Sequence, residues 1–137
     1  MFVLDPQLEA DTLHVTDMRL CTVRLMNDAN YPWAILVPQR QGMADLIDLT
    51  PADRATLALE VDSVSSALKS LTGCHKLNVA ALGNVVRQLH VHVIARFEHD
   101  AAWPAPVWGK VAARAYDNGL GEMLANDLAK AVAVRRA

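Results

Sequence analysis

Residues 88–97, QLHVHVIARF, alternate between polar and apolar side chains, which is typical of a β-strand with one face against a core. Successive side chains of a strand point to opposite faces of the sheet. One face would carry only apolar side chains, namely Leu89, Val91, Val93, Ala95 and Phe97. The other would carry Gln88, His90, His92, Ile94 and Arg96. We therefore expect the apolar face to meet the core and the two imidazoles to border an open pocket beside Gln88.

Short apolar runs elsewhere in the chain predict further strands. Residues 20–26 (LCTVRLM) and 33–38 (WAILVP) are rich in apolar and β-branched residues, and the turn-forming cluster NDANYP between them predicts a β-hairpin. Residues 76–82 (KLNVAAL) predict another strand. Residues 102–109 (AWPAPVWG) contain two prolines and two tryptophans, which indicates an ordered, packed loop.

Two helices are predicted, one long and one near the C-terminus. Thr50 is a favourable N-cap, Pro51 suits the first helical position and Gly73 suits the end, so residues 51–72 should form the long helix. Its apolar face would comprise Leu57, Val61, Val64, Leu68 and Leu71. The C-terminal helix would span residues 119–135, with an apolar stripe of Met123, Leu124 and Leu128. One long helix among hairpin-connected strands indicates an antiparallel α+β fold, with residues 1–137 as a single domain.

The overall composition narrows the class of function. The 137 residues include 13 Lys and Arg against 15 Asp and Glu, which gives no general attraction to nucleic acid. No apolar run approaches the roughly 18 residues that a membrane span needs, and the opening residues do not resemble a signal peptide. Cys21 and Cys74 form neither a disulfide framework nor a zinc-binding spacing. We therefore expect a cytoplasmic protein whose partners are small molecules or proteins, without nucleic acid or membrane.

The pair His90 and His92 allows three interpretations. They could be polar residues on a solvent-facing strand, although histidine is not a favoured strand residue. They could bind a metal, but the candidates for a third ligand, His14, His75 and His99, show no recognisable spacing. They could also catalyse nucleophilic substitution, in which one imidazole attacks phosphorus and a neighbouring polar group handles charge or protons.

The third interpretation gains support because GNVVRQLHVHVI (83–94) resembles the motif of the histidine triad family of nucleotide hydrolases and transferases, His-x-His-x-His followed by two apolar residues. NDANYPWAILVP (27–38) is similar to the family segment that reaches the nucleoside, and LNVAALGN (77–84) to its strand and turn with a phosphate-contacting asparagine. Together these segments cover most of residues 20–97 in the family's order. The resemblance implies an antiparallel sheet with a long helix, extended across a two-fold axis in a homodimer.

The resemblance also implies a role for individual residues. His90 falls on the middle histidine, which forms a covalent nucleotidyl intermediate while a backbone carbonyl holds its other ring nitrogen. His92 falls on the last histidine, which contacts the phosphate and the leaving group. The implied nucleotide-binding residues are Asn27 or Asp28 at the ribose hydroxyls, Asn78 at the phosphate and Asn84 in the turn that follows. No redox cofactor or protein-bound metal is implied, and a divalent metal would come with the substrate.

Two positions depart from the family pattern. Gln88 replaces the first histidine, and Val85 occupies a position where many members carry Ser or Thr. Glutamine can donate and accept hydrogen bonds, so Gln88 could orient a phosphate oxygen or an imidazole, but it cannot take up a proton near neutral pH. We expect a hydrolase or transferase with weakened proton handling. The alternatives are a nucleotide sensor with little turnover and, as a minor one, a metal-binding protein. The leaving group and the base stay open.

Overall fold

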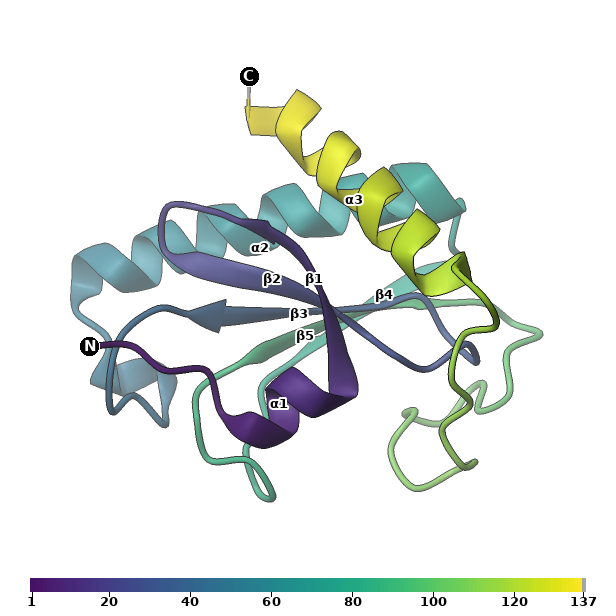
Figure 1. The fold of residues 1–137 in the computed structure, drawn as a ribbon, viewed down its shortest axis with the longest axis horizontal. Coiled ribbons are helices and arrows are strands. Elements are labelled where there is room, and N and C mark those ends of the chain that lie inside the picture. Colours follow the sequence, from purple (N-terminus) through teal and green to yellow (C-terminus); the bar gives the residue numbers. More distant parts are fainter. Residues whose placement is uncertain (137) are drawn as a thin grey trace.

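The computed structural model describes residues 1–136 and confirms an α+β fold (Figure 1). Its elements in chain order are α1 (Pro6–Asp11), β1 (Thr12–Asp17), β2 (Cys21–Met26), β3 (Trp33–Pro38), the 3-10 helix η1 (Leu46–Asp48), α2 (Pro51–Thr72), β4 (Lys76–Ala80), β5 (Val91–Arg96) and α3 (Leu120–Arg136). The strands form one sheet in the order β1-β2-β3-β5-β4, and every neighbouring pair is antiparallel. The predicted hairpin is the β2–β3 pair.

Both faces of the sheet are covered, and the alternating side chains of its strands divide between two buried clusters. Helices α2 and α3 lie on the same side of the sheet (Figure 1). The cluster beneath them includes Val23, Leu25, Ala34, Leu36, Val91, Val93 and Ala95 from the strands. The cluster on the opposite face comprises Leu8, Tyr31, Trp33, Ile35, Val37, Ile94, Ala102 and Val107. The predicted loop at residues 102–109 is therefore packed, and together with α1 it covers the second face.

Helix α2 forms where the sequence predicts it. The Thr50 hydroxyl accepts a hydrogen bond from the amide of Asp53 at 3.1 Å, which satisfies one of the free amides of the first turn. Gly73 follows the last turn with a φ of 66°, a left-handed conformation that glycine adopts without steric cost. The buried apolar positions include Leu57, Val64 and Leu68. The predicted face thus meets the core, except at Leu71 in the last turn, which is exposed.

Helix α3 meets the core at two of the three predicted positions, Leu124 and Leu128. Met123 is 61% exposed, so its assignment to the apolar stripe is wrong. The fully or nearly fully buried side chains are Ala125, Leu128 and Val132, which recur at helical spacing. The helix also approaches β1 very closely, because a Cβ atom added at Gly121 would lie 2.7 Å from the side chain of Leu13. A small residue at this position allows the contact.

The first two elements, α1 and β1, were not predicted from the sequence. Asp5 caps α1 by accepting a hydrogen bond from the amide of Gln7 at 2.8 Å, and Pro6 occupies the first helical position. Strand β1 then pairs with β2, with an irregularity between His14 and Thr16. These elements place the N-terminal segment beside the second face of the sheet, near the residues that precede β5.

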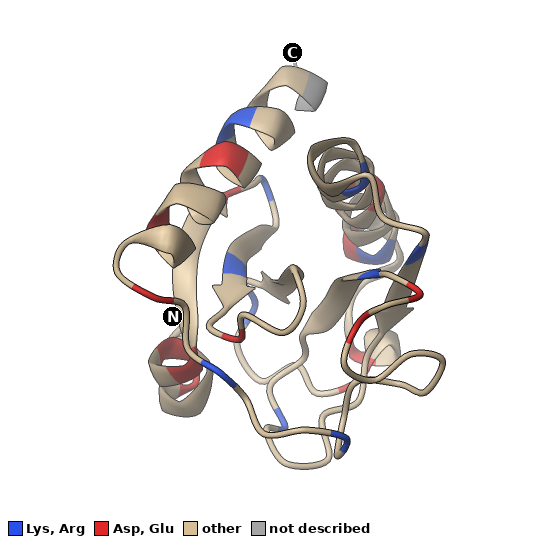
Figure 2. Cartoon of the chain, turned by 90° about the vertical axis from the view of Figure 1, so that its right-hand side faces the viewer, with Lys and Arg blue, Asp and Glu red and all other residues tan. Residues whose placement is uncertain are grey.

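Charged residues are distributed over the whole molecule. In Figure 2, segments that carry Lys or Arg and segments that carry Asp or Glu are interspersed along the helices and loops. Across residues 1–136, the structure contains no helix that is both long enough and apolar enough to span a membrane.

Candidate active site

The motif histidines lie at the start of a strand that is buried on both faces. Strand β5 begins at Val91, later than the predicted residue 88, and lies between β3 and β4. His90 is 6% exposed and His92 is 4% exposed, so the expectation that this face is open is wrong, although both rings line a pocket as expected. The cause is the cover over the second face, which sequence alternation along one strand cannot reveal. Buried polar side chains need hydrogen-bond partners, and both histidines have one.

His90 is held by the backbone just before it. Its Nδ1 atom lies 2.6 Å from the carbonyl oxygen of Gln88. A carbonyl oxygen only accepts hydrogen bonds, so the proton of the neutral ring resides on Nδ1. The other ring nitrogen, Nε2, then carries a lone pair that can act as a nucleophile. This is the carbonyl contact that the sequence resemblance implies.

His92 has the opposite tautomer. The indole Nε1–H of Trp33 donates a hydrogen bond to Nδ1 of His92 at 3.0 Å, and an indole nitrogen can only donate. Nδ1 of His92 is therefore unprotonated, and the proton of the neutral ring is on Nε2. The contact follows from strand register, because Trp33 pairs with Ile94 and is thus the diagonal neighbour of His92.

The surroundings of His92 favour its neutral form. Burial lowers the pKa of His92 from 6.5 to about 4, and the nearby His90 adds to the shift. The rings of His90 and His92 meet edge to face with centroids 4.8 Å apart. The Trp108 ring also meets His92 edge to face, with centroids 5.0 Å apart. His92 is therefore fixed between aromatic rings as a neutral hydrogen-bond donor.

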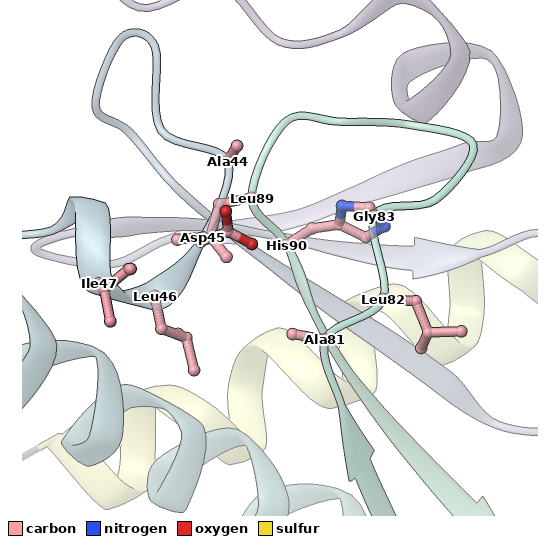
Figure 3. A pocket seen from close by; sticks show the side chains of 9 residues that line it. All are labelled: Ala44, Asp45, Leu46, Ile47, Ala81, Leu82, Gly83, Leu89 and His90. Atoms are coloured by element: carbon pink, nitrogen blue, oxygen red, sulfur yellow. The ribbon is translucent and has the colours of Figure 1, made fainter.

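Two hollows meet at His90. One, of about 350 Å³, contains both histidines. Its lining residues are Gln7, Leu8, Asp11, Met26, Leu82, Gly83, Asn84, Val85, Val86, His90, His92 and Trp108. The other, of about 330 Å³, is bordered by His90 beside Gly83, with Leu46 and Ile47 on its far side (Figure 3). We take the first as the candidate site, because a phosphate there could contact both imidazoles at once.

Comparison with known proteins agrees with this geometry. The sequence profile described as the HIT domain matches residues 7–99. The chain belongs to the histidine triad (HIT) family. Solved structures of histidine triad proteins from Bradyrhizobium japonicum (45% identity, TM-score 0.93), Sinorhizobium meliloti (46%, 0.92) and Marinobacter aquaeolei (40%, 0.94) resemble it closely. The match covers 96%, 94% and 98% of this chain and 98%, 96% and 98% of those chains, respectively.

A curated relative is more distant. The protein named adenylylsulfatase HINT3 from Arabidopsis thaliana is 28% identical over 96 residues, which is 66% of this chain. The match spans 48% of that protein, so this chain corresponds to about half of the relative's length.

The side chain of Gln88, in the position of the first HIT histidine, is used differently from the prediction. The amide of Asp5 donates to Gln88 Oε1 at 2.8 Å, and Gln88 Nε2 donates to the carbonyl oxygen of Val3 at 2.9 Å. Both polar atoms of the side chain therefore bind the N-terminal backbone. This geometry gives no support to a phosphate contact. Gln88 instead reaches the site through its backbone carbonyl, which holds His90.

Of the four predicted nucleotide-binding residues, Asn84 lines the pocket with the histidines. Asn78 lies on β4 and accepts a hydrogen bond from Arg96 Nη1 at 2.7 Å. Asn27 accepts one from the amide of Tyr116 at 3.0 Å, and the carboxylate of Asp28 accepts from the amides of Asn30 and Arg114. Asn27 and Asp28 thus attach the β2–β3 turn to the segment before α3. Their ribose contacts, and the phosphate contact of Asn78, stay predictions.

The candidates for a third metal ligand do not reach the motif histidines. His14 contacts Asp17, His75 lies against the Trp103 ring and near Glu98, and His99 lies against the Phe97 ring. Within residues 1–136, no three or more His, Cys, Asp or Glu side chains are grouped so that they could hold a metal ion.

Several site residues were missed from the sequence. Trp33 lies in a predicted strand, but its contact with His92 depends on the register between strands that are far apart in sequence. Trp108 lies in the loop that was predicted to be packed, and its tryptophans were the available signal. The pocket residues of α1 belong to a helix that was not predicted from the sequence.

The lowered pKa of His92 makes stability depend on pH. Between pH 6.5 and about 4, the unfolded chain binds a proton at His92 that the folded protein does not bind. As the pH decreases through this range, the free energy of unfolding therefore decreases by up to about 1.4 kcal/mol per pH unit. We predict that the free energy of unfolding of the wild-type protein, measured with urea, is roughly 2 kcal/mol lower near pH 4.5 than near pH 7. The His92→Asn variant should lack this decrease. Asparagine is neutral and can still accept from Trp33. Equal pH dependence in both proteins would contradict the prediction.

Proposed function

We propose that the protein is a nucleotide hydrolase or nucleotidyl transferase that attacks the α-phosphorus of a nucleoside phosphate derivative through Nε2 of His90. The observation that carries the proposal is the 2.6 Å contact between His90 Nδ1 and the Gln88 carbonyl, because it leaves a lone pair on the other ring nitrogen. Membership of the HIT family supports it. So does the similarity to a protein named as an adenylylsulfatase.

The reaction would proceed by two displacements. In the first, a bond forms between His90 Nε2 and phosphorus, while the bond to the leaving group breaks and its electron pair departs with that group. The ring becomes positively charged, and the Gln88 carbonyl stabilises this charge through the Nδ1–H it already accepts. In the second, water or another acceptor attacks phosphorus and loses its proton to solvent. The bond between phosphorus and His90 Nε2 breaks, and its electron pair returns to the nitrogen. A divalent metal would enter with the substrate phosphates.

His92 would act as a hydrogen-bond donor and not as an acid. A second proton on its Nδ1 would displace the hydrogen bond from Trp33, so the ring offers only the Nε2–H of a neutral imidazole. Gln88 has no titratable group to replace the missing histidine. Leaving groups that are stable as anions, such as phosphate, sulfate or a nucleotide, should therefore depart fastest. An amine, which must be protonated to leave, should depart more slowly.

The proposal predicts a pattern across substrates. Wild-type protein should release adenosine monophosphate faster from anhydrides, such as adenylyl sulfate and dinucleoside polyphosphates, than from an adenosine phosphoramidate. His90→Ala should lower release by several orders of magnitude, because the covalent route is lost. Release is measured by chromatography, and the nucleotidyl adduct by mass spectrometry without acid, on the peptide that contains LHVHVIAR.

The matched control is His99→Ala, which removes an exposed histidine from the turn after β5 and should leave the rate unchanged. An adduct on another residue, or near-normal turnover in His90→Ala, would contradict the assignment of the nucleophile. Nucleotide binding without any monophosphate release would identify the protein as a nucleotide sensor instead.

We also propose that the protein forms a homodimer through the β4 edge of the sheet. Strand β4 is an edge strand, and its outer backbone groups can pair with another strand. Exposed apolar side chains gather around it, namely Leu46, Ile47, Val79 and Leu82. The hollow between β4 and α2 is lined by Leu57, Val61, Val79 and Val91 among others. A second copy would cover this apolar surface, as the family resemblance implies.

Light scattering tests the assembly. At micromolar concentration the protein should have about twice the monomer mass of 15.0 kDa. Val79→Lys should shift it toward monomer, since a charge would be buried at the interface. Val134→Lys, at an exposed position on α3, should have no such effect. A wild-type protein that stays monomeric under these conditions would contradict the proposal.

A further inference from the structure

Gln88 binds the N-terminal segment as a neighbouring strand would. Its Oε1 accepts from the amide of Asp5 at 2.8 Å, and its Nε2 donates to the carbonyl of Val3 at 2.9 Å. The two polar atoms of a primary amide point to the same side, so they match an N–H and a C=O two residues apart on an extended chain. The two nitrogens of an imidazole diverge, so a histidine at position 88 could not make both contacts.

The segment held by Gln88 forms one wall of the candidate pocket. Asp5, which Gln88 holds, is also the N-cap of α1. From α1, Gln7, Leu8 and Asp11 line the pocket that contains His90 and His92. Leu8 is buried in the second cluster, against which Phe2 and Leu4 also pack. The pocket wall formed by α1 thus continues from an N-terminal segment that the Gln88 side-chain amide attaches to the motif.

The same residue also orients the nucleophile. The carbonyl of Gln88 lies 2.6 Å from Nδ1 of His90, so its side chain holds the N-terminal segment while its backbone holds the His90 ring. A shift of the N-terminal wall would move the Gln88 side chain, and with it the peptide group that fixes the ring of His90. The wall and the ring are thus connected through a single residue.

We propose that Gln88 is a positioning residue that fastens the N-terminal segment as a wall of the pocket and couples the placement of this wall to the orientation of His90. The proposal rests on the proposed function only for the identity of the ligand, a nucleotide. Gln88 therefore does not replace the first histidine by contacting phosphate. It makes a contact that the histidine could not make, and Gln88→His should weaken the site.

A double-mutant cycle in the full-length protein tests the coupling. Gln88→Ala removes the side-chain amide. Asp5→Pro removes the matching N–H, and the φ of −54° at this residue suits proline. Asp5→Ala is the control, because it loses the same capping carboxylate but keeps the N–H. Hydrogen exchange of the peptide covering residues 2–11 and kcat/KM for the release of adenosine monophosphate are measured in each variant.

If Gln88 fastens the wall, Gln88→Ala and Gln88→His should each raise the exchange of this peptide roughly tenfold and lower kcat/KM. Asp5→Pro should raise the exchange and lower kcat/KM more than the control Asp5→Ala does. In the double variant with Gln88→Ala, these effects should increase little further. Unchanged exchange in Gln88→Ala, or effects that add in full, would overturn the proposal. Higher turnover in Gln88→His with unchanged exchange would overturn it in favour of a phosphate contact.

The exchange measurements do not depend on catalysis. A protein that binds nucleotide without turnover would refute the proposed hydrolase or transferase activity, while the exchange cycle would still decide whether Gln88 fastens the N-terminal segment.

Discussion

Burial of β5 on both faces is the constraint on which the site depends. A polar group removed from water on such a strand needs a hydrogen-bond partner, or it destabilises the fold by the cost of its desolvation. His90 is paired with the Gln88 carbonyl, and His92 with the indole of Trp33. Arg96, which is 1% exposed, binds both carboxylate oxygens of Asp100 at 2.8 and 3.1 Å. The contacts that make the strand stable are therefore the contacts that orient its chemical groups.

The two histidine partners differ in kind, and this difference gives the rings complementary properties. A carbonyl requires a proton on the nitrogen that it faces, whereas an indole N–H requires a lone pair. Both partners bind Nδ1, so Nε2 is a lone pair in His90 and a donor in His92. A nucleophilic nitrogen of His90 and a hydrogen-bond donor of His92 thus lie side by side in the same site. The environment of His92 maintains this state, because burial lowers its pKa to about 4.

The sequence predicts those features that depend on local pattern. Alternation identified Val91, Val93 and Ala95 as the core face of β5, and capping residues defined α2. The motif resemblance also identified His90, His92 and Asn84 as site residues, and the structure places all three in one pocket. Features that depend on distant contacts escaped prediction. Alternation along one strand cannot say whether a second layer covers its polar face, and a glutamine beside two histidines gives no sign that it binds a backbone more than 80 residues earlier.

The opposite tautomers of the two histidines are the central claim, and nitrogen NMR tests them directly. In protein labelled with ¹⁵N-histidine, two-bond ¹H–¹⁵N correlation spectra near neutral pH distinguish protonated from unprotonated ring nitrogens. The spectra of His92→Asn and His90→Ala assign the signals of the two rings. The account predicts a proton on Nδ1 and none on Nε2 in His90, with the reverse in His92. The same tautomer in both rings, or a doubly protonated His92, would contradict it.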